Sequence, residues 1–234
     1  MSRLSEIRSR STAADMLEGQ PQHLGIALLM TAGALALMRA PQGAEPLFGL
    51  TSVGWARLSI ALALLHQVMV AFVFRVQLHR NLMSRLFGRN DMAIWRALFL
   101  PLLVARPVTV LLTGRADPAQ IGLPAWIGWP VGLTLLALAV WAMHSTLVYF
   151  TLPRALGGDH FRDHFAAMPL VDKGAFRYTS NAMYGVVFSG LWGLALLCDS
   201  WNALILALFQ QSYIWVHMYC TENPDMDWIY GNRL

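Results

Sequence analysis

Charged residues are scarce in this sequence of 234 residues. Asp, Glu, Lys and Arg together account for 13% of the chain, whereas apolar residues account for 56% and the mean hydropathy is +0.48. A soluble domain of this length needs far more charge to cover its surface. The scarcity of charge therefore excludes an ordinary soluble protein and predicts one that is embedded in a membrane.

Lysine is almost absent: of the 17 basic residues, only Lys173 is a lysine. The net charge of +4 therefore rests on arginines, and these are scattered between apolar blocks. Segments that bind nucleic acid instead gather basic and aromatic residues together. We expect no nucleic-acid partner.

Cysteine is also rare, since Cys198 and Cys220 are the only two. They fall near opposite ends of one predicted helical hairpin, which is too far apart for the two sulfur atoms to bond. Both are therefore expected to be free thiols without a redox role.

Apolar residues gather in six long blocks, and a helix needs about 20 of them to cross the hydrocarbon of a bilayer. The first and fifth blocks are short, so five or four spans are the alternatives to six. The fold class that this pattern predicts is all-α: a polytopic transmembrane helical bundle with about six spans. The blocks are Leu24–Met38, Val53–Phe74, Ala93–Leu112, Pro124–Phe150, Tyr184–Leu197 and Trp201–Tyr219.

The distribution of arginines predicts the topology. If the N-terminus is inside, most arginines fall on inner segments, whereas the outer loops hold only Arg39 and Arg115, as the positive-inside rule requires. We expect an integral protein of a bacterial inner membrane with both termini and the active site in the cytoplasm. The stretch Met1–Gln22 lacks an apolar core, so the first span is expected to be retained rather than cleaved. Near the ends of the second block, Arg57 and Arg75 are expected to snorkel to the two interfaces.

Two polar segments lie on the predicted inner face: Thr151–Phe176 and the tail after Tyr219. Carboxylates and imidazoles at a membrane boundary are costly unless they are satisfied or used, although an ordinary solvated loop is the alternative. The stretch Asp159–His164 holds two acids and two histidines, but its spacing matches no standard zinc pattern. We expect no metal. His66, in the middle of the second block, is either functional or a hydrogen-bonding contact between helices.

The C-terminal third carries the resemblance to a family. The run Arg177–Gly185 resembles the signature of membrane methyltransferases that act on phosphatidylethanolamine or on isoprenylcysteine carboxylates. The tail Thr221–Met226 is similar to the ending of the phospholipid branch, and Gly158–Phe161 is similar to a Gly-Asp-Tyr-Phe element that precedes the signature there. Two positions depart from the usual signature: Ala182 stands where proline is usual, and Ser180 stands where arginine often does.

The resemblance implies a membrane enzyme that uses S-adenosyl-L-methionine, with the cofactor pocket at the inner face near the C-terminal hairpin. Residues 1–234 then form a single integral membrane domain, in which 1–120 are N-terminal spans without an assigned role and 121–234 are the methyltransferase-like core. Glu222 is expected to accept the cofactor's amine and Arg177 to bind its carboxylate. The residues implied to bind the cofactor are Arg177, Tyr178, Asn181, Met183, Tyr184, Gly185, His217 and Glu222.

The expected reaction is N-methylation of the phosphatidylethanolamine headgroup, which makes a membrane lipid the substrate. An amine acceptor must first lose a proton, and the candidate bases are His160, Asp159 and Glu222, with the histidine first because its ordinary pKa lies nearest to neutral pH. Alternative acceptors are a prenylcysteine carboxylate, a small thiol or another amphiphile. A non-catalytic transporter or scaffold is a second alternative. The sequence does not determine the oligomeric state.

Overall fold

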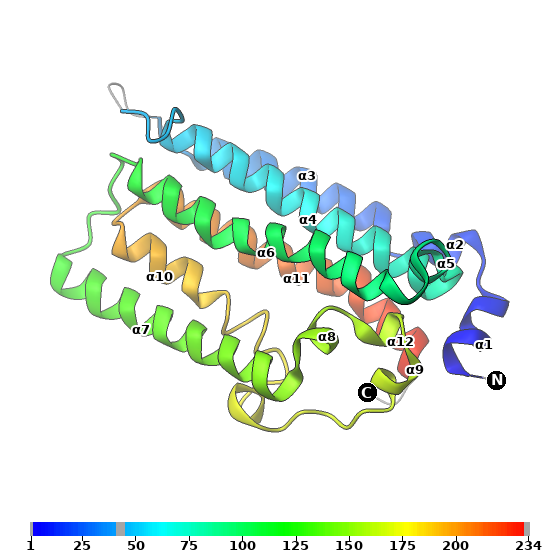
Figure 1. Cartoon of the computed structure of the whole chain (residues 1–234). Coiled ribbons are helices and arrows are strands. Elements are labelled where there is room, and N and C mark those ends of the chain that lie inside the picture. The colour runs from blue at the N-terminus through cyan, green and yellow to red at the C-terminus, as the bar shows by residue number, and fades with distance from the viewer. Residues whose placement is uncertain (1, 41–44, 232–234) are drawn as a thin grey trace.

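The computed structural model describes residues 2–40 and 45–231, and every regular element in that part of the chain is helical. Figure 1 shows the main helices lying roughly along one direction as a bundle, with both termini marked at the same end. The main helices are α3 (Gln20–Leu37), α4 (Ser52–Arg80), α6 (Asp91–Arg115), α7 (Ala125–Ser145), α10 (Ser189–Leu197) and α11 (Trp201–His217).

Short helices cluster at the end of the bundle that carries the termini (Figure 1). We refer to it as the terminal end. The α-helices there are α1 (Arg3–Arg10), α2 (Ala13–Leu17), α5 (Leu82–Phe87), α8 (Leu152–Ala155), α9 (Asp163–Ala166) and α12 (Asn223–Tyr230). The 3-10 and π turns of the chain are η1 (Gly88–Asn90), η2 (Thr146–Phe150), η3 (Gly158–His160), η4 (Gly174–Arg177) and η5 (Met218–Glu222).

Three helical segments are long and apolar enough to cross a membrane: Ser52–Arg80, Leu82–Arg115 and Ala125–Phe150. The helices α3 and α11, with 18 and 17 residues, are close to the usual length of a span. The prediction of an all-α membrane bundle is confirmed, and each of the six apolar blocks corresponds to a helix. The number of helices that cross the bilayer stays a prediction.

The fifth block differs from its prediction. A helix was expected over Tyr184–Leu197, but α10 begins only at Ser189 and has nine residues. Residues 178–188 form consecutive turns, in which the N–H groups of Tyr184 and Gly185 both donate to the Asn181 carbonyl. The backbone N–H groups of Tyr184 and Gly185 are therefore used within the turns.

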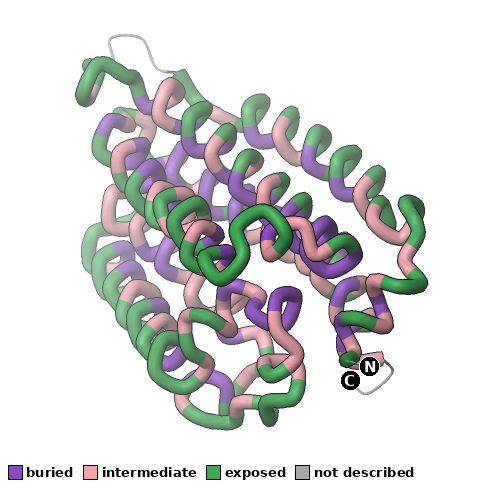
Figure 2. The backbone as a smooth tube through the Cα atoms, turned by 45° about the vertical axis from the view of Figure 1, so that its right-hand side comes forward, coloured by how far each residue is buried: buried purple, intermediate pink, exposed green. Residues whose placement is uncertain are grey.

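Apolar side chains cover both the inside and the outside of the bundle. Buried residues of α3, α4, α6, α10 and α11 form the largest core cluster. On the outside, Leu29 on α3 and Trp126 on α7 are 75% and 77% exposed. Figure 2 shows this arrangement, with buried segments inside the bundle and exposed ones on its outer faces. An apolar exterior of this kind is what lipid contact requires.

The hairpin of α10 and α11 is held closely against the rest of the bundle. A Cβ atom at Gly193 would lie only 2.7 Å from the Gly132 carbonyl oxygen on α7, so α7 and α10 touch through their backbones. At the end opposite the termini, the Asp117 carboxylate accepts from the Ser200 hydroxyl at 2.6 Å and from the Asn202 N–H at 2.8 Å. The hairpin is therefore fixed at its turn, and its other end lies among the short helices.

Candidate active site

The helix α11 changes its winding where it reaches the terminal end. After His217 it continues as the π-helical turn η5, and α12 follows directly at Asn223. A π turn inserts a residue into the helical repeat and often occurs at functional sites. Here it carries Glu222, whose Oε1 accepts a hydrogen bond from the Tyr184 hydroxyl at 2.5 Å.

Glu222 is the carboxylate at the centre of this group. His217 Nε2 lies 3.5 Å from the same Oε1, and the Glu222 side chain is 19% exposed. Glu222 follows the end of the last apolar block, and burial raises the pKa of its carboxyl to about 7. The hydrogen bond from Tyr184 and the charge of His160 lower that pKa, so they limit the rise. A carboxyl with this pKa exchanges its proton near neutral pH, as a general base must.

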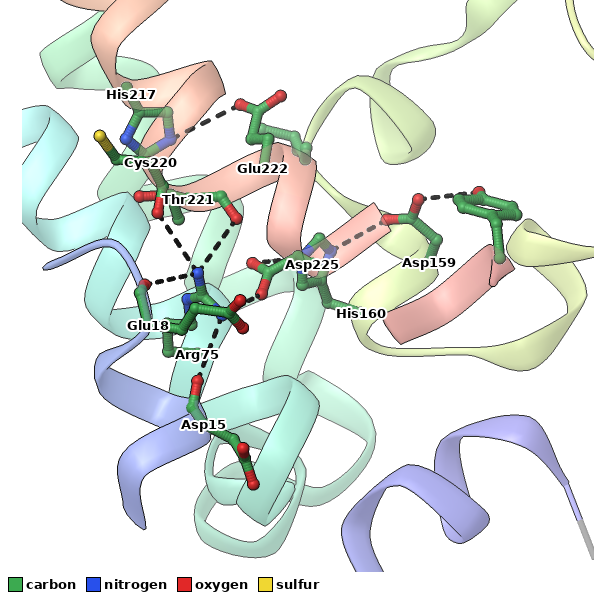
Figure 3. Close-up of polar contacts among 12 residues, drawn as sticks. Asp15, Glu18, Arg75, Asp159, His160, His217, Cys220, Thr221, Glu222 and Asp225 are labelled. Atoms are coloured by element: carbon green, nitrogen blue, oxygen red, sulfur yellow. Dashed lines mark hydrogen bonds and ion pairs between the residues drawn. The ribbon is translucent and has the colours of Figure 1, made fainter. Parts of the chain in front are cut away.

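A second chain of polar groups lies beside Glu222 and is shown in Figure 3. Arg75 Nη1 on α4 lies 3.0 Å from Asp225 Oδ1 on α12, and Asp225 Oδ2 lies 3.1 Å from His160 Nε2. The other ring nitrogen of His160 lies 3.0 Å from Asp159 Oδ1, whose second oxygen accepts from the Tyr230 hydroxyl at 2.9 Å. Three separate segments of the chain are therefore joined by one buried ionic network.

The position of Arg75 corrects the expectation that it snorkels to an interface. Its side chain is 3% exposed and donates to four backbone carbonyls besides its ion pair: Glu18 at 2.9 Å, and Asp15, Cys220 and Thr221 at 3.4 Å each. Gly19 lies against the same turn with φ +74°, and a Cβ atom there would lie 2.1 Å from the Cys220 carbonyl oxygen. The N-terminal part of the chain therefore packs against the turn that carries Glu222.

His160 is fully buried between two carboxylates and stacks on Phe74 with a ring distance of 4.1 Å. Burial opposes its protonation, but the hydrogen bonds to Asp159 and Asp225 and the charges of these acids outweigh burial and raise the pKa of His160 to about 10. The pKa of Asp159 is lowered: burial raises it, but the hydrogen bond and charge of His160 prevail. His160 is thus a protonated bridge rather than a free base at neutral pH.

The raised pKa of His160 makes stability depend on pH. The folded protein binds a proton here that the unfolded chain releases above its ordinary value of 6.5. The stabilisation is therefore complete below pH 6.5 and is lost as the pH rises through about 10. We expect the melting temperature of the detergent-solubilised protein to fall across this window, and His160→Gln to remove the dependence. His164→Gln, at an exposed position on α9, should retain it; an equal slope in both variants would contradict the assignment.

The structure brings some of the predicted site residues together and leaves others apart. Tyr184, His217 and Glu222 converge, with Asp159 and His160 in the adjoining network. Asn181, Met183 and Gly185 lie in the turns that present Tyr184 and are partly buried. Arg177 and Tyr178 are exposed, and Tyr178, at 77%, faces Trp141 at a ring distance of 6.0 Å.

Sequence reasoning missed Asp225 and Arg75 as site residues. Asp225 belongs to the tail that carried the resemblance, so its carboxylate was visible but had no assigned partner. Arg75 lies far from the tail in sequence, and only packing of α4 against the tail makes them neighbours. The free thiols expected at Cys198 and Cys220 are confirmed. No group of three or more possible metal ligands occurs among residues 2–40 and 45–231.

The part of the chain that carries Tyr184, His217 and Glu222 matches known proteins. Residues 128–233 match the phospholipid methyltransferase family. The match starts in α7 and runs to the tail, so it contains the signature, the hairpin and the π turn. It does not reach α3, α4 or α6, and Arg75 on α4 therefore lies outside it.

Curated relatives agree with this match. A phosphatidylethanolamine N-methyltransferase of Lodderomyces elongisporus is 28% identical over 112 residues, which is 45% of this chain and 12% of that protein. The protein of the same name from Scheffersomyces stipitis is 29% identical over 43% of this chain and 12% of its own length, and that of Candida albicans is 32% identical over 32% and 8%. The chain thus spans about an eighth of the length of the first two relatives. No solved structure gives a significant match.

Proposed function

We propose that this protein methylates the amine of a membrane phospholipid, phosphatidylethanolamine, with S-adenosyl-L-methionine as the donor. The observation that carries the proposal is the pairing of Glu222 with Tyr184 at the terminal end of the α10–α11 hairpin, within the segment that matches the phospholipid methyltransferases. The apolar exterior of the bundle supports an acceptor that reaches the site from the bilayer.

The residues present fit a zwitterionic, partly aromatic cofactor. Glu222 supplies a negative charge for an amine, and Tyr184 and Trp215 supply aromatic surface, with their rings 6.4 Å apart. His217 Nδ1 and the Tyr213 hydroxyl are buried without a hydrogen-bond partner among the described residues. Both groups are therefore free to form hydrogen bonds with a bound ligand. When bound, S-adenosylmethionine supplies an activated methyl group on a sulfonium centre.

The chain's own contribution is to orient the acceptor and to remove its proton. A protonated amine has no lone pair, so a base must take its proton before a methyl group can be accepted. Glu222 is the base that we propose in preference to His160, because His160 is held protonated between Asp159 and Asp225. The buried site excludes water and aligns the reactants, which supplies much of the acceleration of an in-line displacement.

The proposed site lies at the terminal end of the bundle, where the short helices gather. We propose that this end faces the cytoplasm of a bacterium, because both termini lie at the same end and the segments there carry most of the arginines (Figure 1). The proposed division into residues 1–120 and 121–234 separates the chain by its similarity to the family. The two parts are not separate in space, because Arg75 and Gly19 of the first part contact the second part at the site.

The reaction is tested in membranes of a host that makes no methylated phospholipids. Membranes with and without this protein would receive methyl-labelled S-adenosylmethionine, and the lipid extract would be resolved by mass spectrometry. Label in mono-, di- or trimethylated phosphatidylethanolamine is the expected result. Label only in base-labile methyl esters or in small thiols would replace the acceptor by a carboxylate or a thiol, and no labelled product with no donor binding would contradict the proposal.

The pH dependence of the reaction provides a second test. The carboxylate form of Glu222 is the base, and its pKa is about 7, so kcat/KM should fall as the pH drops through about 7. The hydrogen bond from Tyr184 lowers this pKa. Tyr184→Phe is therefore expected to move the acid limb of the pH–rate profile to higher pH. Tyr178→Phe, at an exposed position in the same segment, is the control and should leave the limb in place.

A further inference from the structure

An arginine lies buried in the bundle without an acid to neutralise it. Arg106 on α6 is 3% exposed, and no carboxylate of the described residues lies within 4 Å of its guanidinium. Its Nε donates to Gln210 Oε1 at 2.8 Å, one Nη donates to the Gln210 carbonyl at 3.4 Å, and its Cζ lies 4.9 Å from the centre of the Phe188 ring. A buried unpaired charge in a membrane protein is costly and typically functional.

Polar side chains without partners lie on α4 and α11, two of the helices that pack against α6. His66 on α4 is 1% exposed, and neither of its ring nitrogens has a hydrogen-bond partner among the described residues. The hydroxyl of Tyr213, also fully buried, has none either. His23 on α3 packs between Tyr213 and His217, at ring distances of 5.4 and 5.6 Å. Buried polar atoms are nearly always satisfied in folded proteins, so this set indicates a ligand that is bound during function.

The cluster is continuous with the proposed catalytic site. Gln210, which accepts from Arg106, lies one turn before Tyr213 on α11, so the two side chains share a face of that helix. Tyr213 packs against His23, His23 packs against His217, and His217 Nε2 lies 3.5 Å from Glu222 Oε1. Tyr184 also donates to Glu222. One end of this buried polar region therefore carries the negative Glu222 and the other end the positive Arg106, with tyrosines and histidines between them.

We propose that Arg106 binds the oxyanion of a zwitterionic reactant whose amine lies at Glu222. The inference rests on the proposed function, because both reactants of that reaction are zwitterions. Phosphatidylethanolamine pairs an amine with a phosphate, and the methyl donor pairs an amine with a carboxylate. Guanidinium is the side chain best suited to either oxyanion, since its N–H groups match the oxygens in pairs. Arg106, His66 and His23 all precede residue 128, so the charged group of this subsite and two of its histidines come from helices outside the family match.

The first experiment separates the two possible sources of the oxyanion. Arg106→Gln would be compared with wild type for the affinity of purified protein for S-adenosylhomocysteine, which carries the donor's carboxylate, and for the KM for phosphatidylethanolamine in mixed micelles. Loss of a charge-assisted hydrogen bond is expected to weaken one of the two by about tenfold or more. Weakened S-adenosylhomocysteine binding identifies the donor's carboxylate, and a raised lipid KM identifies the phosphate. If neither changes, the inference is overturned.

Two further measurements exclude a merely structural role. Arg96→Gln, at an exposed position on the same helix α6, should change neither quantity. The second measurement removes the oxyanion from the ligand: decarboxylated S-adenosylmethionine replaces the donor, or an ethanolamine lipid without a phosphate replaces the lipid. The wild-type protein should bind the truncated ligand as weakly as Arg106→Gln binds the natural one. If Arg106→Gln fails to fold, Arg106→Lys and these ligand-side tests still decide the question. Full affinity of wild type for both truncated ligands overturns the subsite, whereas absent methylation by wild type overturns only the proposed function.

Discussion

Replacing Glu222 by glutamine is expected to reduce methyl transfer to phosphatidylethanolamine by at least about a hundredfold, which is the usual range for loss of a general base. Glutamine has nearly the same shape and still accepts the hydrogen bond from Tyr184, but it cannot take a proton. The fold should therefore persist while the reaction fails. The measurement is the initial rate of labelled lipid formation at saturating donor and lipid.

The tail offers a matched control for this substitution. Asp227 lies five residues further along, on α12, and is exposed. Asp227→Asn removes one negative charge from the same segment and is expected to leave the rate within about twofold, because exposed charges interact weakly with their surroundings. Retention of nearly full activity in Glu222→Gln would remove Glu222 from the role of base and leave it a binding or structural residue.

Replacing Arg75 by methionine is expected to destabilise the protein by roughly 3–5 kcal/mol, the usual cost when one partner of a buried ion pair is removed. Asp225 would lose its guanidinium partner at 3.0 Å, and the carbonyls of Glu18, Cys220 and Thr221 would lose a donor. The measurement is the thermal unfolding of detergent-solubilised protein. Arg80→Met, at an exposed position on the same helix α4, is expected to change stability little.

A double substitution tests the mechanism of this loss. Asp225→Asn in the Arg75→Met background removes the carboxylate that would otherwise be left without its arginine, so the double variant should be more stable than the sum of the two single effects predicts. Strict additivity would show that the two side chains do not interact. Donor binding should fall with stability in Arg75→Met, since the π turn that holds Glu222 also loses its support.

The positions of the site residues show how far sequence patterns reach. Tyr184, His217 and Glu222 were predicted as one group because a signature and a tail recur in a fixed order, and the structure places them together. Arg177 and Tyr178 belong to the same signature, yet both are exposed. A motif records which residues occur at a given spacing, but the turns at 178–188 decide which of them face inward.

His160 illustrates a different limit. Its ordinary pKa made it the first choice for a base, but that choice assumed a solvated side chain. In the structure it lies between Asp159 and Asp225, and these two acids keep it protonated. A pKa depends on neighbours that come from distant parts of the chain, so no local pattern predicts it.

The sequence by itself determined that this protein is a helical membrane bundle, because the length and spacing of apolar blocks follow directly from the thickness of a bilayer and the rise of a helix. It also determined the segment that resembles a phospholipid methyltransferase. Only the tertiary structure decided that Arg75 supports the turn that carries Glu222 and that Arg106 is buried beside Gln210. Each of these arginines lies in an apolar helix, where sequence alone predicts that the side chain faces lipid or reaches to the membrane interface. Contacts with Asp225 and Gln210, more than 100 residues away along the chain, bury them instead, and such pairings exist only after the helices have packed.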